Sequence, residues 1–160
     1  MELRLARLPV SLLAIAMIAS AQSSTSQGYW VDPSTRLMWA GRDNGKDVNW
    51  RTAKKYCRDL RLGGYSDWRL ATIDELKGIY DSTAAAPGRG GGHGEVPLTF
   101  HVKGNLFLTG DPWSSTQRID DRGRPIGFAW FFDFLNVRNR ADPTDHVSRK
   151  RALCVRQSGE

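Results

Sequence analysis

The sequence predicts an α+β domain, because a strand hairpin is followed by two helices and then by several strands. The first observation is the length of 160 residues, which suits one domain with its own core. The second is a composition of 40% hydrophobic and 25% charged residues, which is typical of a globular protein and excludes general disorder. The third is the order of patterns along the chain, which changes from turn-centred apolar runs to helical spacing and then to β-prone runs.

Residues 1–21 have the pattern of a secretory signal peptide, and a polar tail at 22–27 follows. Two arginines precede an apolar stretch from Leu8 to Ile18, and an Ala-Ser-Ala sequence then offers a cleavage site. That stretch is only about half as long as a membrane span, so a membrane anchor is disfavoured. We therefore expect an exported protein, periplasmic or secreted, with one domain at 28–156 and a short tail at 157–160.

Cys57 and Cys154 are the two cysteines of the chain. Cysteines of an exported chain usually pair, so we expect a disulfide between them. The sequence has no C-x-x-C motif and no histidine beside either cysteine, so nothing indicates a metal or redox role.

The first elements are expected to be a hairpin and a helix. Two short apolar runs between Tyr29 and Ala40 flank Asp32-Pro33-Ser34-Thr35, which has turn chemistry. Asn49 can cap a helix that runs from Trp50 to about Leu60 and ends at a Gly-Gly pair. Residues at helical spacing give this helix one apolar face: Trp50, Ala53, Cys57 and Leu60.

A second helix is expected to begin at Thr72, which has the capping-box spacing to Glu75, and to fade near Asp81. The segment from Ala84 to Gly94 that follows is rich in small residues and glycine, so we expect a flexible excursion. A phosphate-binding loop is the alternative, but no Lys-Ser/Thr pair follows.

The second half of the chain contains β-prone runs separated by Gly, Asp and Pro. The run from Phe128 to Leu135 is almost continuously apolar, which is typical of a central strand buried on both faces. An aromatic platform for sugar is the alternative for this run. Asp121-Arg122-Gly123-Arg124 is expected to form an exposed hairpin tip, while Trp68 and Trp113 are expected to pack in the core.

Several sequence blocks resemble the C-terminal domain of the Legionella collagen-like adhesin, over about residues 28–156. In order, the blocks are Trp30-Val31-Asp32-Pro33, Leu37-Met38-Trp39, Trp50-Arg51-Thr52-Ala53, Tyr56-Cys57, Gly63-Gly64-Tyr65-Ser66-Asp67-Trp68-Arg69-Leu70, Thr72-Ile73-Asp74-Glu75-Leu76, Trp113-Ser114-Ser115-Thr116 and Cys154-Val155-Arg156. Ala71 departs from the family pattern, which has Pro at the entry to the second helix. This change should leave the helix cap intact.

The same residues are also similar to the C-type-lectin-like fold. That resemblance implies two helices packed on short, mainly antiparallel strands, and one disulfide from the first helix to the last strand. The superfamily includes calcium lectins, calcium-free binding modules and an oxidase, so the fold leaves function open.

Catalytic and metal-binding patterns are not apparent in the sequence. The calcium-lectin motifs are missing, and Asp120, Asp121, Asp142 and Asp145 are expected to be turn and surface acids rather than calcium ligands. His93, His101 and His146 accompany no catalytic motif. We therefore expect no enzyme activity, no metal and no cofactor. The enzyme alternative is a copper-dependent, oxidase-like protein, which would need two unpaired thiols.

A basic segment near the C-terminus is the candidate ligand-binding site. Its members are Arg138, Arg140, Arg149, Lys150 and Arg151, with Arg156 beyond them. Arginine suits sulfate and carboxylate oxygens, and the resemblance to the adhesin implies binding of sulfated glycosaminoglycans.

We therefore expect a calcium-independent binding module for anionic glycans or cell-surface polymers. It would bind no specific nucleic acid and would not span a membrane, and its oligomeric state is left open. The alternative is a periplasmic structural or interaction protein with no glycan ligand.

Overall fold

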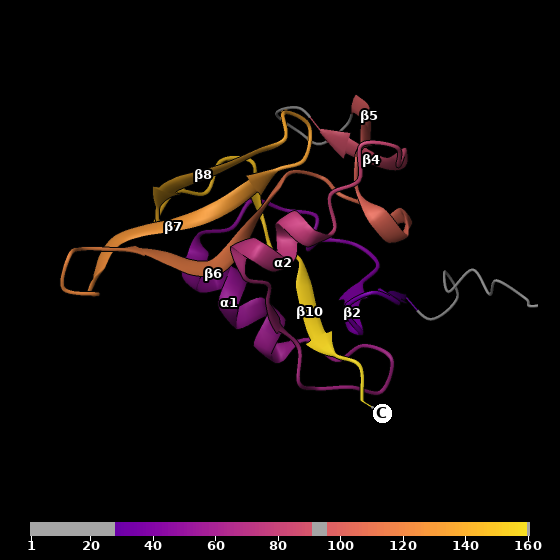
Figure 1. Ribbon diagram of the computed structural model, residues 1–160, viewed down its shortest axis with the longest axis horizontal. Helices are drawn as coiled ribbons and strands as arrows, with labels where there is room; N and C mark the ends of the chain where they lie inside the picture. Colours follow the sequence, from indigo (N-terminus) through magenta and orange to yellow (C-terminus); the bar gives the residue numbers. More distant parts are fainter. Residues whose placement is uncertain (1–27, 91–95, 160) are drawn as a thin grey trace, which may run out of the picture.

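The computed structural model describes residues 28–90 and 96–159, so the expected signal peptide and the polar tail at 22–27 lie outside the described residues. The elements of this part are drawn in Figure 1. In chain order they are β1 (Tyr29–Val31), β2 (Leu37–Ala40), α1 (Trp50–Asp59), β3 (Arg69–Leu70), α2 (Ile73–Gly78), β4 (Ala86–Gly90), β5 (Val96–Phe100), the 3-10 helix η2 (Lys103–Asn105), β6 (Asp111–Ile119), β7 (Pro125–Asp133), β8 (Arg138–Pro143), β9 (Lys150–Arg151) and β10 (Cys154–Gln157).

The expected α+β, C-type-lectin-like fold with two helices on short strands is wrong, because the protein is mostly β. The second helix, α2, has only 6 residues, so α1 is the one longer helix in the described part. Strands β6 and β7 have 9 residues each and are not short. The capping box marks where α2 starts, and the helix ends at Gly78, earlier than the expected end near Asp81.

The segment expected as a glycine-rich excursion instead forms β4 over part of its length. Strand β4 pairs antiparallel with β5, and every second residue of β4 is buried. A Cβ at Gly88 would lie 2.3 Å from the carbonyl oxygen of Leu108 and 2.5 Å from the ring of Phe100. Glycine is therefore needed at this position for close packing. The remaining residues of the expected excursion, 91–94, lie outside the described part.

The first sheet has the order β1-β2-β10-β3 with antiparallel pairing, and it separates two apolar clusters. Alternate residues of β2 point to opposite faces, so Trp39 joins one cluster and Met38 the other. The first cluster includes the apolar residues of α2 and of the β4–β5 hairpin. The second includes the buried face of α1. This sheet is therefore covered on both sides.

The second four-stranded sheet has the order β8-β7-β6-β9. Phe131 and Phe132 of β7 join different clusters, as expected for a strand that is buried on both faces near its end. The other half of β7 is more exposed, because the β6–β7 hairpin extends away from α1 (Figure 1). Asp120 accepts hydrogen bonds from the backbone of Arg122 and Arg124 at the hairpin tip, so the expected tip is confirmed.

Helix α1 begins where the sequence predicts. The side chain of Asn49 accepts a hydrogen bond from the backbone N–H of Thr52, and Trp50, Ala53 and Cys57 are buried. The capping box of Thr72 and Glu75 is also present, so the change to Ala71 leaves the cap intact. These local predictions are confirmed although the fold class is not.

Cys57 of α1 and Cys154 of β10 form a disulfide across 97 residues, which confirms the expected pairing. Both cysteines are at most 1% exposed, so the bond lies inside the second apolar cluster. Trp68 and Trp113 are buried in the same cluster, as expected. The indole of Trp113 donates a hydrogen bond to the carbonyl of Val48, 3.0 Å away.

We predict that replacing Cys57 and Cys154 together by Ala lowers the free energy of unfolding by about 4–5 kcal/mol, because an uncrosslinked unfolded chain has more entropy. Urea denaturation of the parent protein and the double variant measures this difference. Thiol labelling of the denatured, unreduced parent should give no adduct. Two labelled thiols per chain would contradict the pairing.

Candidate functional site

The five basic residues expected to bind ligand fall into two groups. Arg138 and Arg140 of β8 and Arg149 in the preceding turn of β9 are exposed. Lys150 and Arg151 form β9 and are only 4% and 6% exposed. All five were expected in one ligand-binding segment, whereas the structure places Lys150 and Arg151 in a short strand that pairs in parallel with β6.

Arg138 and Arg140 lie on one face of β8, the outer strand beside β7 (Figure 1). In the antiparallel register, Arg138 lies opposite Asp133 and Arg140 lies opposite Phe131. Directly opposite residues share a face, and residues two apart on a strand are separated by about 7 Å. Neither guanidinium forms a hydrogen bond or ion pair within the described part of the chain. Both are therefore available to a ligand.

Lys150 is buried beneath this face. Its ammonium nitrogen lies 3.1 Å from a carboxylate oxygen of Asp142 and 3.7 Å from one of Asp111. It also lies 3.7 Å from the centre of the Phe131 ring. Lys150 is thus a buried cation that interacts with two carboxylates and an aromatic ring of the protein itself. It therefore has a structural role.

Asp111 links Lys150 to the exposed Arg149. Burial raises the pKa of Asp111, the charge of Lys150 opposes this shift, and the neighbouring Asp133 raises the pKa further. Arg149 lies 4.0 Å from Asp111 and its side chain remains 56% exposed. The result is a surface with three exposed arginines, Arg138, Arg140 and Arg149, which we call the β8 face.

Arg151 points away from the β8 face, because it is the neighbour of Lys150 in a strand. Its guanidinium pairs with Asp47 and donates hydrogen bonds to the hydroxyl and carbonyl oxygens of Thr109, at 2.7 and 3.0 Å. Arg156 also interacts within the protein, since it pairs with Asp67 and stacks on Tyr65 at 3.8 Å. Both side chains join distant parts of the chain.

The other polar residues considered in the sequence have local partners. The Nδ1 atom of His101 lies 2.9 Å from the carbonyl oxygen of Ala84, and His146 lies 4.0 Å from Asp142. His93 lies outside the described residues. Within residues 28–90 and 96–159, no group of three or more His, Cys, Asp or Glu side chains has a geometry that could hold a metal ion.

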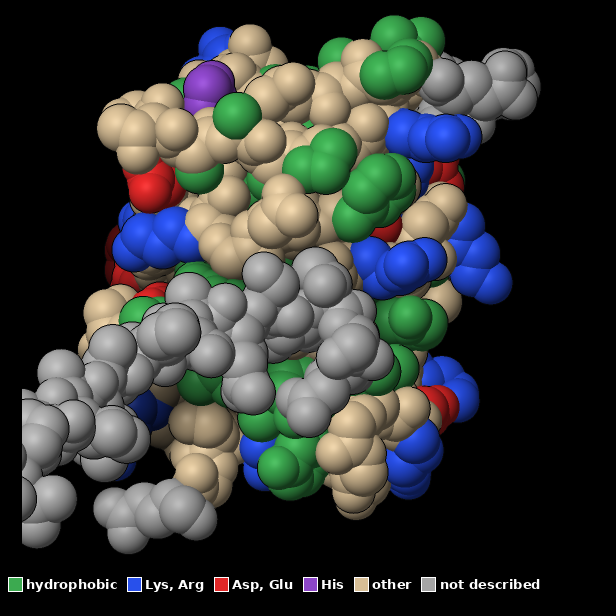
Figure 2. Space-filling model, turned by 90° about the vertical axis from the view of Figure 1, so that its right-hand side faces the viewer, with side chains coloured by type: hydrophobic (Ala, Val, Ile, Leu, Met, Phe, Trp, Pro, Cys, Tyr) green, Lys and Arg blue, Asp and Glu red, His purple; other side chains and the backbone are tan. Residues whose placement is uncertain are grey.

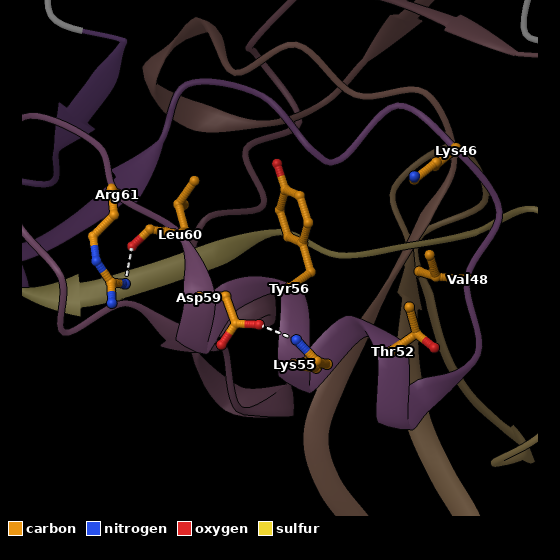
Figure 3. Close-up of a pocket in the computed structure, with 8 residues that line it drawn as sticks. All are labelled: Lys46, Val48, Thr52, Lys55, Tyr56, Asp59, Leu60 and Arg61. Carbon is orange, nitrogen blue, oxygen red and sulfur yellow. Dashed lines mark hydrogen bonds and ion pairs between the residues drawn. The ribbon is translucent and has the colours of Figure 1, made fainter.

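A cavity of about 450 Å³ that the sequence did not predict lies beside α1 (Figure 3). The polar face of the helix forms one wall of the cavity, and the segment that leads from β2 to α1 forms the other. Its lining residues are Lys46, Val48, Thr52, Lys55, Tyr56, Asp59, Leu60 and Arg61. The signal that could have indicated it is Tyr56, an aromatic residue among the basic residues of the polar helix face.

Figure 2 shows Lys and Arg side chains around the edges of one face of the molecule, with acidic side chains next to several of them. Of the described helices, none is long and apolar enough to cross a membrane.

The fold and these sites define a small, disulfide-closed, mostly β domain with a row of exposed arginines on an outer strand. The chain belongs to the Lcl C-terminal domain family, which it matches over residues 28–156. A search of curated proteins finds no match. Membership confirms the resemblance seen in the sequence blocks, and it indicates a non-catalytic, adhesin-like domain. Because both thiols are in the disulfide, a copper-thiol mechanism would lack its sulfur ligands.

We predict that Lys150→Met lowers the free energy of unfolding by about 3–5 kcal/mol, because Asp111 is then left buried without its main cation. Arg149→Met is the matched control, and since that pair is exposed its expected cost is below about 1 kcal/mol. Adding Asp111→Asn to Lys150→Met should recover part of the loss. Urea denaturation tests all three variants, and equal costs for Lys150→Met and Arg149→Met would contradict the structural role.

Proposed function

We propose that this protein is an exported, non-catalytic binding module that recognises anionic glycans or cell-surface polymers through the β8 face, without calcium. The observation that carries the proposal is the pair Arg138 and Arg140, two exposed guanidinium groups on one face of a strand. Neither has a partner within the described residues.

The geometry of the pair suits a repeating polyanion. Two arginines about 7 Å apart along a strand can meet successive charged groups of an extended polymer. Each guanidinium offers a planar set of donors that matches the oxygens of sulfate or carboxylate. Arg149 adds a third positive charge next to Asp111.

Two further observations support an extracellular binding role. The Cys57–Cys154 disulfide is of the kind that forms in oxidising compartments, which agrees with the expected export. The family of the domain is adhesin-like. The alternative is a structural or interaction protein without a glycan ligand, and it predicts no retention on a sulfated polymer at low salt.

We predict that Arg138→Ala with Arg140→Ala weakens heparin binding by roughly 2- to 30-fold, as follows from losing two exposed charge contacts of about 0.2–1 kcal/mol each. Binding should weaken steeply with salt, since exposed charges are screened beyond about 8 Å at physiological ionic strength. It should persist in the presence of a calcium chelator. Elution salt from a heparin column and titration calorimetry provide the two measurements.

The matched control is Arg51→Ala with Arg122→Ala, which removes the same charge from two exposed arginines on α1 and at the β6–β7 hairpin tip. Lys150 and Arg151 are left unchanged, because their loss would disturb folding. If the two double variants elute at the same salt as each other, only net charge matters and the β8 face is not the site.

A further inference from the structure

The cavity beside α1 has two different walls. One wall is the polar face of the helix and the residues directly after it, and the other is the segment at 42–48. Figure 3 shows the ring of Tyr56 between these walls, with Lys46 and Val48 to one side and Leu60 and Arg61 to the other. The cavity therefore combines one aromatic ring, two aliphatic side chains and several cations.

Both walls are fixed in place by the core. The backbone N–H of Asn44 donates to the carbonyl of Ala152 at 3.0 Å, and the Asn44 side chain accepts from the N–H of Ala152 at 2.7 Å. The N–H of Val48 donates to the carbonyl of Lys150 at 3.1 Å. The helix wall is anchored by the disulfide of Cys57, the residue next to Tyr56. A ligand thus meets a preformed site, which reduces the entropy cost of binding.

The cations of the cavity are partly unused. Lys46 forms no side-chain interaction within the described residues. Arg61 uses only Nη1, which donates to the carbonyls of Arg58 and Leu60 at 3.3 and 3.0 Å, so Nη2 and Nε remain free. Lys55 is paired with Asp59. The unpaired charge of the cavity lining is therefore positive, and it comes from Lys46 at one end and Arg61 at the other.

Tyr56 gives the cavity an apolar surface and a polar group. Its residue is 36% exposed, and its hydroxyl makes no hydrogen bond within the described part. Burial raises the pKa of Tyr56, and the nearby Asp43 raises it further. The hydroxyl therefore stays protonated at neutral pH and can donate a hydrogen bond.

We propose that this cavity binds one hexuronate unit, a pyranose ring that carries a carboxylate. The ring would lie against Tyr56 and Leu60, which cover its C–H groups. Lys46 would bind the carboxylate, and the hydroxyl of Tyr56 would bind a ring hydroxyl.

The size and chemistry of the cavity favour this ligand over other anions. Its volume of about 450 Å³ lies in the range of small-molecule sites and leaves room for a single sugar ring. A simple anion would leave the aromatic and aliphatic surface uncovered, and a neutral sugar would leave Lys46 without a partner. The proposal involves none of the arginines of the β8 face, so it can fail or hold independently of the proposed function.

The test is titration of the ¹⁵N-labelled mature protein with D-glucuronate, followed by amide chemical shifts. A monosaccharide of this size should bind with a dissociation constant on the order of 1 mM. We expect the largest shifts at Lys46, Val48 and Tyr56. Glucose, which lacks the carboxylate, and acetate, which lacks the ring, should each bind at least tenfold more weakly.

Lys46→Gln and Tyr56→Ala should each weaken glucuronate binding about tenfold or more, a loss of the size expected for one charged or stacking contact. Arg51→Gln is the matched control on α1, outside the cavity, and should bind as the parent does. Both substituted side chains are exposed at the cavity, so the amide spectra should show that each variant is folded. If Tyr56→Ala does not fold, Lys46→Gln alone still tests the proposal. Equal affinity in Lys46→Gln and the parent, or equal binding of acetate, would overturn the proposal. Loss of glucuronate binding only in the variant Arg138→Ala with Arg140→Ala would also overturn it, and would leave the proposed function standing.

Discussion

The Cys57–Cys154 disulfide joins the one longer helix of the described part to the strand that lies at the centre of the first sheet. Strand β10 lies between β2 and β3, and its alternate residues contribute to both apolar clusters. Fixing α1 to this strand therefore fixes the helix relative to both sides of the core. The cavity wall at Tyr56 depends on the same bond, because Tyr56 directly precedes Cys57.

The residues before β10 also join distant parts of the chain, and they do so through ion pairs. Lys150 and Arg151 alternate in β9, so one reaches Asp111 and Asp142 while the other reaches Asp47. These contacts bring together the β6–β8 sheet and the segment that precedes α1. Arginine and lysine residues that are adjacent in sequence thus have structural roles, although their sequence alone resembles an anion-binding cluster.

Local features of the fold were predictable from sequence, and features that depend on distant partners were not. Asn49 and the Thr72–Glu75 box identify helix starts, because capping involves residues only three positions apart. The glycine-rich segment was expected to be an excursion, but Gly88 packs closely against Leu108 and Phe100 in strand β4, and these contacts with distant residues carry no sequence signal. The burial of Arg151 depends on Asp47, which is 104 residues away and carries no sequence signal. Among the five expected site residues, the sequence therefore could not separate exposed from buried cations.

That separation gives a physical criterion for function in a basic domain. A cation that already has buried carboxylate partners loses them if it binds a ligand, so the exchange yields little free energy. Lys150, which pairs with the largely buried Asp111, is in this class, and Arg151 already pairs with Asp47. Arg138, Arg140 and Lys46 have no side-chain partner within the described residues. Arg138 and Arg140 lie on the outer strand of one sheet, whereas Lys46 lies beside α1 at a cavity that also contains an aromatic ring. The first place suits the regular charge of a polymer, and the second suits the shape of a single sugar ring.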